Sequence, residues 1–162
     1  MDISSALLKF SLGLALGAGA TTPATAQSVY SGSHPHMVVP EGLTWTDAPA
    51  VALGAKIAVI EGPLNQPVPF TFRLRIPANS KIAPHTHSAF ERVTVLSGTF
   101  FFAHGDRYDP AKTSPLGPGS VAIMPPDTPM FGYTKEETVI QLHGTGPWGI
   151  TYLNPAEDPR KK

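Results

Sequence analysis

Cysteine is absent from this chain of 162 residues, so disulfide bridges and a lipid-carrying N-terminal cysteine are both excluded. Stability must therefore come from packing, with a bound metal as an additional source. The chain also lacks an excess of charge of one sign, because twelve basic residues balance twelve acidic ones. A neutral chain has no basic face to meet phosphates, and we expect no nucleic-acid partner.

Certain catalytic arrangements are also missing. There is no Ser/His/Asp or Cys/His constellation, which disfavours hydrolysis by a side-chain nucleophile. No glycine-rich loop of the kind that cradles phosphates is present, so nucleotide binding is disfavoured more strongly. After the first 26 residues, no window of about 11 to 18 residues keeps a helical period. Fifteen glycines and eighteen prolines instead favour many short strands joined by turns.

Long hydrophobic runs are scarce, and the run at the N-terminus, Phe10–Ala20, is too short to span a bilayer as a helix. Lys9 precedes it, and the small residues at 24–26 form a cleavage pattern. Residues 1–26 are therefore predicted to be a secretory signal peptide. The chain should be exported, periplasmic or secreted, with no membrane attachment after cleavage. Asp2 offsets Lys9 and keeps open the alternative of an uncleaved amphipathic anchor.

The remaining 136 residues (162 − 26) are enough for one domain with a buried core. Residues 27–49 are predicted to be an irregular N-terminal arm, 50–155 the β-domain and 156–162 a polar C-terminal tail. Strand signals lie at 56–60, 69–76, 91–97, 99–103, 120–124, 130–133, 138–143 and 149–153. The stretch 109–117 is predicted to be a polar loop. The expected fold class is all-β, a small antiparallel β-barrel.

Two of these strand signals also predict which side chains face the interior. At 69–76, apolar side chains alternate with polar ones, and the two arginines should lie on the outer face. At 91–97, Glu91 shares one face with Val93 and Val95. If the valines face the interior, the carboxylate of Glu91 faces it as well.

The most informative stretch is Pro84–Glu91, which contains His85 and His87 and is followed by Gly98. Two histidines one residue apart project to the same side of an extended strand, and a carboxylate four residues further on has the same parity. Imidazole nitrogens and a carboxylate oxygen suit Mn, Fe, Ni or Zn, and two histidines with one carboxylate form the ligand set of non-haem iron oxygenases. The alternative interpretation makes the histidines ordinary loop residues and Glu91 a solvated charge.

These residues resemble the first signature of the cupin superfamily, in which two histidines one residue apart are followed by a glutamate and then, seven positions later, by a glycine. In cupins this segment forms a pair of strands of a small β-barrel, and the two histidines and the glutamate bind a metal inside it. The resemblance implies a cupin-type double-sheet jelly roll over 50–155. It also implies that the three side chains are metal ligands and that Gly98 lies at the following hairpin turn. The stretch 144–155 is similar to the ends of small bacterial cupins, a likeness that names no substrate.

A second cupin signature, Gly-x5-Pro-x-Gly-x2-His, is matched in part by residues 119–130. Gly119 and Pro125 fit the pattern. Asp127 stands at the second glycine position, and aspartate is among the few other residues that tolerate a left-handed turn conformation. Met130 stands where the family usually places its last metal-ligating histidine, and a thioether is a soft and weak ligand.

Met130 leaves three interpretations open. The metal is held by three protein ligands with further positions for water or substrate, Met130 is a loose axial ligand, or the site has lost its metal. The first is favoured because the His/His/Glu set is intact. His143 is the other candidate for the missing ligand, since a hairpin of 130–133 with 138–143 would bring it close to Met130. Whether its ring then faces the interior depends on a one-residue register that the sequence does not fix.

An apolar pocket is expected around the metal, and at least one of the three consecutive phenylalanines at 100–102 should face it. The predicted pocket residues are Val93, Val95, Phe100, Phe102, Met130 and Tyr133. The predicted cofactor is one divalent transition metal, Mn, Fe, Ni or Zn. The predicted partner is a small-molecule substrate or ligand, and the phenylalanine-rich strands also permit a homodimer.

A metal with open coordination positions acts as a Lewis acid, activates water, or binds O2 together with a chelating substrate. Cupins of this size include dioxygenases, isomerases and lyases, so the resemblance implies a metal-dependent enzyme acting on a small organic molecule. The altered fourth position favours a different function, a non-catalytic module that binds a small ligand or a metal. A third possibility is a structural envelope protein, which would respond to neither metal nor ligand. The sequence leaves open which of the three applies, and therefore whether the chain is an enzyme.

Overall fold

The computed structural model describes residues 29–32 and 34–162, so the predicted signal peptide lies outside the described residues and export stays a prediction from the sequence. The described residues contain no α-helix. Their strands are β1 (Thr46–Asp47), β2 (Lys56–Glu61), β3 (Pro69–Ile76), β4 (Lys81–Thr86), β5 (Glu91–Ser97), β6 (Phe100–His104), β7 (Ser114–Leu116), β8 (Val121–Met124), β9 (Met130–Thr134), β10 (Thr138–Thr145) and β11 (Thr151–Tyr152). Short 3₁₀ helices are η1 (Pro40–Gly42), η2 (Pro110–Lys112), η3 (Pro155–Glu157) and η4 (Pro159–Lys161). No helix in this part of the chain is long and apolar enough to cross a bilayer.

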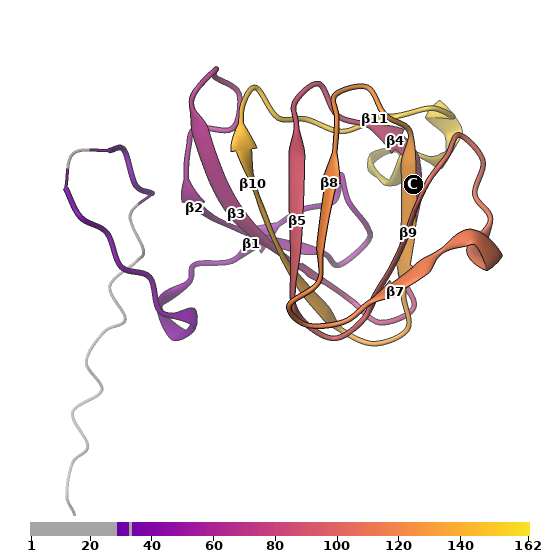
Figure 1. The fold of residues 1–162 in the computed structure, drawn as a ribbon, viewed down its shortest axis with the longest axis horizontal. Helices are drawn as coiled ribbons and strands as arrows, with labels where there is room; N and C mark the ends of the chain where they lie inside the picture. Colours follow the sequence, from indigo (N-terminus) through magenta and orange to yellow (C-terminus); the bar gives the residue numbers. More distant parts are fainter. Residues whose placement is uncertain (1–28, 33) are drawn as a thin grey trace, which may run out of the picture.

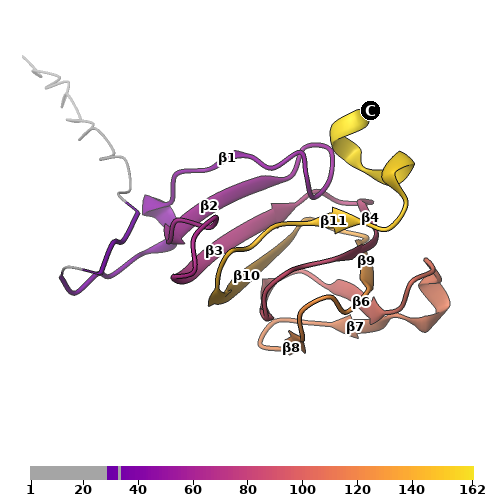
Figure 2. The same ribbon diagram turned by 90° about the horizontal axis from the view of Figure 1, so that it is seen from above.

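The strands form two antiparallel sheets that pack face to face (Figures 1 and 2). The larger sheet has the order β1-β2-β3-β10-β5-β8, and the smaller sheet has the order β11-β4-β9-β6-β7. In the view from above, β1, β2 and β3 lie on one side of the molecule and β6, β7 and β9 on the other (Figure 2). Consecutive strands repeatedly change sheets, as in a jelly roll. The predicted all-β, double-sheet architecture is confirmed.

Strand β10 lies in the middle of the larger sheet because it pairs with β3 on one side and with β5 on the other. Ile140 of β10 lies opposite Leu74 of β3 and opposite Val95 of β5. Leu142 repeats the pattern two residues later. Side chains that oppose one another in an antiparallel ladder project to the same face. The three strands therefore present one continuous apolar face to the smaller sheet, and the alternation predicted for 69–76 and 91–97 is confirmed.

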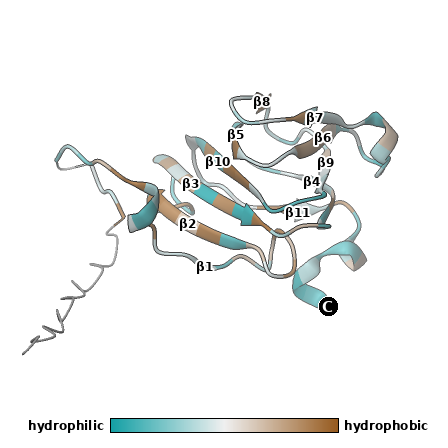
Figure 3. Ribbon diagram, turned by 90° about the horizontal axis from the view of Figure 1, so that it is seen from below, coloured by the Kyte–Doolittle hydropathy of each residue, from teal (hydrophilic) through white to brown (hydrophobic). Residues whose placement is uncertain are grey.

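The outer face of β3 carries the two arginines, as predicted. The Nε of Arg73 donates to Oε1 of Gln141 on β10 at 3.1 Å. The guanidinium group of Arg75 lies 4.4 Å from the centre of the Trp45 ring. Figure 3 shows these hydrophilic patches along β3 beside the hydrophobic strands β2 and β10. Both arginines therefore have partners on the outside of the sheet, and the inner face of β3 carries apolar side chains.

Both sheets contribute to the hydrophobic core between them. The larger sheet supplies Phe72 and Leu142, and the smaller sheet supplies Ile82 and Phe100. Full burial of one such side chain is worth about 1.5–3 kcal/mol. Because the net stability of a whole domain is only about 5–15 kcal/mol, a small number of these side chains decides whether the chain folds.

Two segments differ from the sequence prediction. The predicted polar loop at 109–117 contains η2 and the short strand β7, which pairs with β6. The predicted hairpin of 130–133 with 138–143 is wrong, because β9 pairs with β4 and β6 in the smaller sheet while β10 belongs to the larger one. The turn between β9 and β10 carries the chain from one sheet to the other. Alternation and turn residues predict strands, but they do not settle whether consecutive strands pair.

The segments at the two ends of the described chain contact the β-domain. In the N-terminal arm, β1 pairs with the edge of β2, and Tyr30 forms an isolated bridge with Glu61. In the C-terminal tail, Oε1 of Glu157 lies 2.7 Å from Nζ of Lys81 at the start of β4. The arm therefore extends the larger sheet, and the tail is held against the smaller one.

The turn between β5 and β6 requires glycine at position 98. Gly98 has a φ of +72°, and a Cβ atom there would lie 2.5 Å from the carbonyl oxygen of Glu137 and 2.9 Å from Cα of Thr138. We expect Gly98→Ala to lower the free energy of unfolding by about 2–5 kcal/mol, because the left-handed conformation costs roughly 1–2 kcal/mol and the forced shift of the neighbouring backbone costs roughly 1–3 kcal/mol. Urea unfolding followed by tryptophan fluorescence measures the loss.

Gly119→Ala is the matched control for this substitution. Gly119 has a φ of +86°, yet no atom lies within 4 Å of an added Cβ. The free energy of unfolding of Gly119→Ala should fall by only roughly 1–2 kcal/mol, which is the cost of the left-handed backbone conformation alone. Equal losses in the two variants would show that the close approach at Gly98 does not contribute.

Candidate functional site

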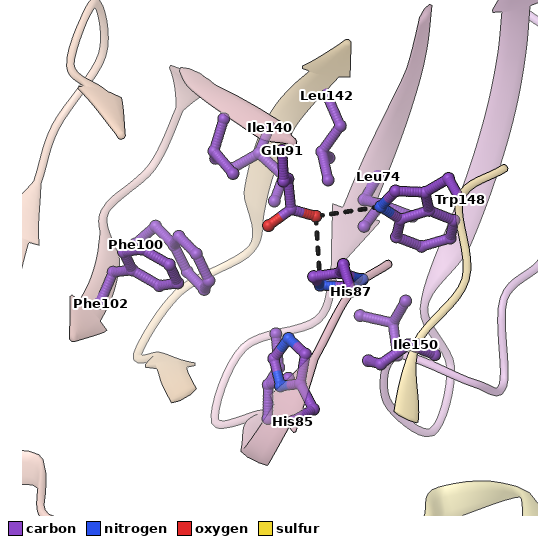
Figure 4. A pocket seen from close by; sticks show the side chains of 13 residues that line it. Leu74, His85, His87, Glu91, Phe100, Phe102, Ile140, Leu142, Trp148 and Ile150 are labelled. Atoms are coloured by element: carbon purple, nitrogen blue, oxygen red, sulfur yellow. Dashed lines mark hydrogen bonds and ion pairs between the residues drawn. The ribbon is translucent and has the colours of Figure 1, made fainter. Parts of the chain in front are cut away.

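The three predicted ligand residues line one cavity between the sheets (Figure 4). His85 lies near the end of β4, His87 follows that strand directly, and Glu91 is the first residue of β5. All three are almost fully buried, with exposed fractions of 5%, 3% and 3%. The backbone N–H of Asp127 donates to the carbonyl oxygen of His87 at 2.8 Å. Asp127 adopts the left-handed conformation predicted for it, with a φ of 57°.

Backbone hydrogen bonds fix the tautomer of both histidines. Nδ1 of His85 lies 2.7 Å from the carbonyl oxygen of Ala83, and Nδ1 of His87 lies 2.7 Å from that of Gly149. A carbonyl oxygen only accepts, so each Nδ1 carries the hydrogen and each Nε2 of the neutral ring keeps its lone pair. Metal-binding histidines show the same arrangement, in which the ring nitrogen not bound to metal donates to a carbonyl or carboxylate oxygen.

One oxygen atom of the Glu91 carboxylate contacts both His87 and Trp148. Oε1 lies 3.3 Å from Nε2 of His87 and accepts a hydrogen bond from the indole Nε1 of Trp148 at 3.2 Å (Figure 4). A carboxylate oxygen and an imidazole lone pair attract each other only through a shared proton or cation. Two ligand atoms each about 2.1 Å from one ion, with an angle of roughly 90–105° between them, lie about 3.0–3.3 Å apart. The spacing of this pair therefore fits two ligands of one metal ion.

Burial controls the ionisation of these groups. Burial raises the pKa of Glu91, and the nearby His87 and the hydrogen bond from Trp148 act in the opposite direction. Burial, together with the proximity of His87, lowers the pKa of His85 to about 3, against the opposing effect of its hydrogen bond to Ala83. His85 is therefore neutral near pH 7, and the neutral ring is the form that binds metals.

His85 does not complete a three-ligand group in this arrangement. Its ring centroid lies 4.9 Å from that of His87, with an angle of 80° between the ring planes. Its other aromatic neighbour is Tyr152, at 5.7 Å between centroids. Within residues 29–32 and 34–162, no three His, Cys, Asp or Glu side chains are grouped so as to hold a metal ion. Nε2 of His87 and Oε1 of Glu91 therefore lie close together, and the His85 side chain is not grouped with them.

Met130 lies beside His85 on the interior face of the smaller sheet. The two residues are paired across β4 and β9, and paired residues in an antiparallel ladder project to the same face. Met130 is 1% exposed and belongs to the hydrophobic core. A fourth ligand at position 130 would therefore come from the strand next to that of His85, and the thioether makes this side of the site apolar.

His143 lies outside the site. On β10 the buried residues Ile140 and Leu142 face the interior, so the adjacent His143 faces outward, opposite Thr71 of β3 and Arg92 of β5. The prediction of His143 as a substitute ligand is wrong for two reasons. The hairpin on which it rested does not form, and the register places the ring on the outer face.

The predicted pocket is found in part. The predicted residues that line the cavity are Val93, Phe100 and Phe102. Val95 and Met130 are buried in the core without lining it. Tyr133 has the opposite parity to Met130 and lies on the other face of the smaller sheet, where its ring stacks on that of Phe101 at 4.6 Å. The placement of Tyr133 in the pocket is therefore wrong.

The sequence analysis missed Trp148 and Ile150, which lie on the connection between β10 and β11 and complete the cavity wall. The indole stacks on the His87 ring, with 5.1 Å between centroids and 18° between planes, and meets Phe72 edge-on at 4.7 Å. Trp148 precedes the strand predicted at 149–153 and lies in a stretch without a strand period, so alternation could not assign its side chain to the interior. The one signal was a large aromatic residue in a glycine-rich stretch. The cavity volume of about 30 Å³ is enough for one ion or one water molecule.

Comparisons with known proteins bear on the fold. No protein-family model and no curated protein matches the chain. The polyketide cyclase RemF from Streptomyces resistomycificus is similar over 79% of this chain and 92% of its own, with a TM-score of 0.63 and 16% identity. A candidate acetylacetone dioxygenase from Methylibium petroleiphilum PM1 is similar over 80% and 88%, with a TM-score of 0.59 and 16% identity. An RmlC-like cupin from Shewanella frigidimarina NCIMB 400 is similar over 69% and 91%, with a TM-score of 0.55 and 14% identity. These likenesses concern the fold, and the chain has the cupin fold that its two motifs predicted.

Proposed function

We propose that this chain is a metal-binding cupin that acts on a small organic molecule through dioxygenase, isomerase or lyase chemistry. The proposal is carried by the buried pair of His87 and Glu91, whose Nε2 and Oε1 atoms lie 3.3 Å apart in the wall of an otherwise apolar cavity. His85 becomes the third ligand when its ring turns toward this pair. The folds most similar in the comparisons include a cyclase and a candidate dioxygenase, which is consistent with small-molecule chemistry.

The side chains around the pair have distinct roles in this function. A divalent Mn, Fe, Ni or Zn ion would supply a Lewis acid with open coordination positions. Glu91 provides the negative charge of the ligand set, and the carbonyl group of Gly149 holds the His87 ring in its metal-binding tautomer. Phe100 and Phe102 exclude water from one side, which strengthens the electrostatic attraction between charged ligands and a polar substrate group.

Binding without turnover is the second candidate function, and two observations favour it. Met130 replaces the last ligand of the family pattern, which lowers the ligand count of the site. The cavity volume of about 30 Å³ admits no organic substrate until side chains move. A module that only holds a metal or a small ligand at its mouth needs no such movement.

An assay for turnover distinguishes the metal-dependent enzyme from the non-catalytic binding module. The protein is loaded with each metal in turn and incubated with small diketones, enols and hydroxy acids, while NMR follows the organic compounds and an electrode follows O2. Turnover that disappears in Glu91→Gln supports the enzyme. One bound metal per chain without turnover supports the binding module.

Metal uptake tests the site itself. The chain from residue 27 onward, incubated with excess Fe(II), Mn(II), Ni(II) or Zn(II) and desalted, should retain about one ion per chain by plasma mass spectrometry. His87→Ala and Glu91→Gln should weaken binding by more than the roughly 10- to 100-fold typical of losing a group that only orients a ligand. In the wild type, metal at about 100 times its Kd should stabilise the fold by roughly 2.7 kcal/mol, seen as a higher Tm.

His143→Gln is the control for this experiment, because His143 faces away from the cavity. It should take up metal as the wild type does. Wild-type protein that retains none of the four metals would remove the metal-dependent function, and equal loss in His143→Gln would show that the ion binds elsewhere.

Position 130 distinguishes a three-ligand site from a four-ligand one. Met130→His adds an imidazole next to His85 in the ladder, and we expect it to tighten metal binding by at least about tenfold, or roughly 1.4 kcal/mol. Met130→Leu keeps the volume without a sulfur ligand, so its metal affinity should equal that of the wild type. Isothermal titration with Zn(II) measures both. A weaker affinity in Met130→Leu would instead identify the thioether as an axial ligand.

A further inference from the structure

Trp148 makes two contacts with the site and one with the hydrophobic core, although it lies more than fifty residues from the ligand motif in sequence. Its indole Nε1 donates to Oε1 of Glu91 at 3.2 Å. One face of the ring stacks on His87. Its edge contacts Phe72 of β3, in the core of the larger sheet. The same ring therefore touches both members of the pair that fits a metal and is supported from behind by the core.

The residue that follows Trp148 contributes a second restraint. The carbonyl oxygen of Gly149 accepts the hydrogen bond from Nδ1 of His87 at 2.7 Å. Two consecutive residues of one connection thus orient two different ligands, one through a side chain and one through the backbone. The ligand motif itself provides no hydrogen bond of this kind to either group.

The connection between β10 and β11 is itself anchored. The backbone N–H of Trp148 donates to the carbonyl oxygen of Leu64 at 2.6 Å, and that of Gly146 donates to Val68 at 2.9 Å. Both acceptors lie between β2 and β3. The Ser88 hydroxyl donates to the carbonyl oxygen of Pro147 at 3.0 Å, which ties the connection to the ligand motif. The indole is therefore presented from a fixed backbone.

A buried carboxylate that accepts no hydrogen bond is free to rotate about its terminal torsion, because that torsion has a broad minimum. The indole N–H removes this freedom and directs Oε1 of Glu91 toward Nε2 of His87. The geometry points to Trp148 as a positioning residue that holds Glu91 in its ligand orientation, an inference that rests on the proposed function. Phenylalanine at this position keeps an aromatic ring and removes the indole donor.

Trp148→Phe tests the inference, with Trp45→Phe as the matched control, because Trp45 contacts Arg75 on the outer face and not the cavity. Trp148→Phe should weaken Co(II) or Zn(II) binding by about 10- to 100-fold, as is usual when a partner that orients a ligand is lost. The visible Co(II) bands should also change in intensity, because they report ligand geometry. Trp45→Phe should change neither. An unchanged affinity and unchanged bands in Trp148→Phe would overturn the positioning role.

A metal-free measurement separates this inference from the proposed function. In ¹⁵N-labelled protein the indole N–H resonance of Trp148, assigned by its absence in Trp148→Phe, should shift in Glu91→Gln because the acceptor changes from a carboxylate to an amide. The resonance of Trp45 should stay in place. A Trp148 resonance that does not move overturns the positioning role even where metal binds. Wild-type protein that binds no metal but shows the shift contradicts the metal function, while the contact between Trp148 and Glu91 stands.

Discussion

The arrangement of the interior depends on one constraint, the burial of a carboxylate and two imidazoles between two apolar sheets. Removing such groups from water is costly unless each finds a partner. The fold supplies these partners at close range. Two backbone carbonyl groups bind the Nδ1 atoms, an indole N–H binds the carboxylate, and the carboxylate lies against an imidazole. An apolar side chain of similar size at position 91 would fill the core without this cost, so packing alone does not explain the carboxylate.

The need for hydrogen-bond partners also explains why the connection between β10 and β11, which is distant in sequence from the ligand motif, is itself held by hydrogen bonds. The connection between β10 and β11 brings the indole N–H of Trp148 and the carbonyl oxygen of Gly149 to the ligand motif at the same time, whereas β4 supplies the carbonyl oxygen of Ala83 to His85. A connection of irregular backbone has unpaired groups to offer, but only a fixed one can offer them at a defined place. Its hydrogen bonds to Leu64 and Val68 provide that fixation. The site is therefore assembled from both sheets and from a loop that bridges them.

The sequence predicts those parts of this arrangement that depend on the local alternation of apolar and polar residues along a strand. Alternation placed Glu91 with Val93 on the inner face and the arginines of β3 on the outer face, and both placements are correct. The cupin motifs anticipated the turn glycine at 98 and the left-handed Asp127. The wrong predictions concern residues whose position depends on which strands pair with one another in the folded chain. β9 and β10 follow each other in sequence but lie in different sheets, so His143 faces outward. Trp148 lies in a segment without a period, and no local rule could place its ring.

Met130 gives the site an asymmetry that bears on what it can bind. The ring of Trp148 contacts both His87 and Glu91, whereas His85 is paired across the ladder with Met130, a neutral thioether that does not line the cavity. Under the proposed function, the ligands His87, Glu91 and a rotated His85 would together supply one negative charge. A divalent cation bound to them would therefore keep a net positive charge. Such a charge next to apolar walls attracts an anionic oxygen atom on an otherwise apolar molecule, since the low dielectric of the cavity strengthens the attraction. Under the proposed function, enolates and carboxylates meet this description.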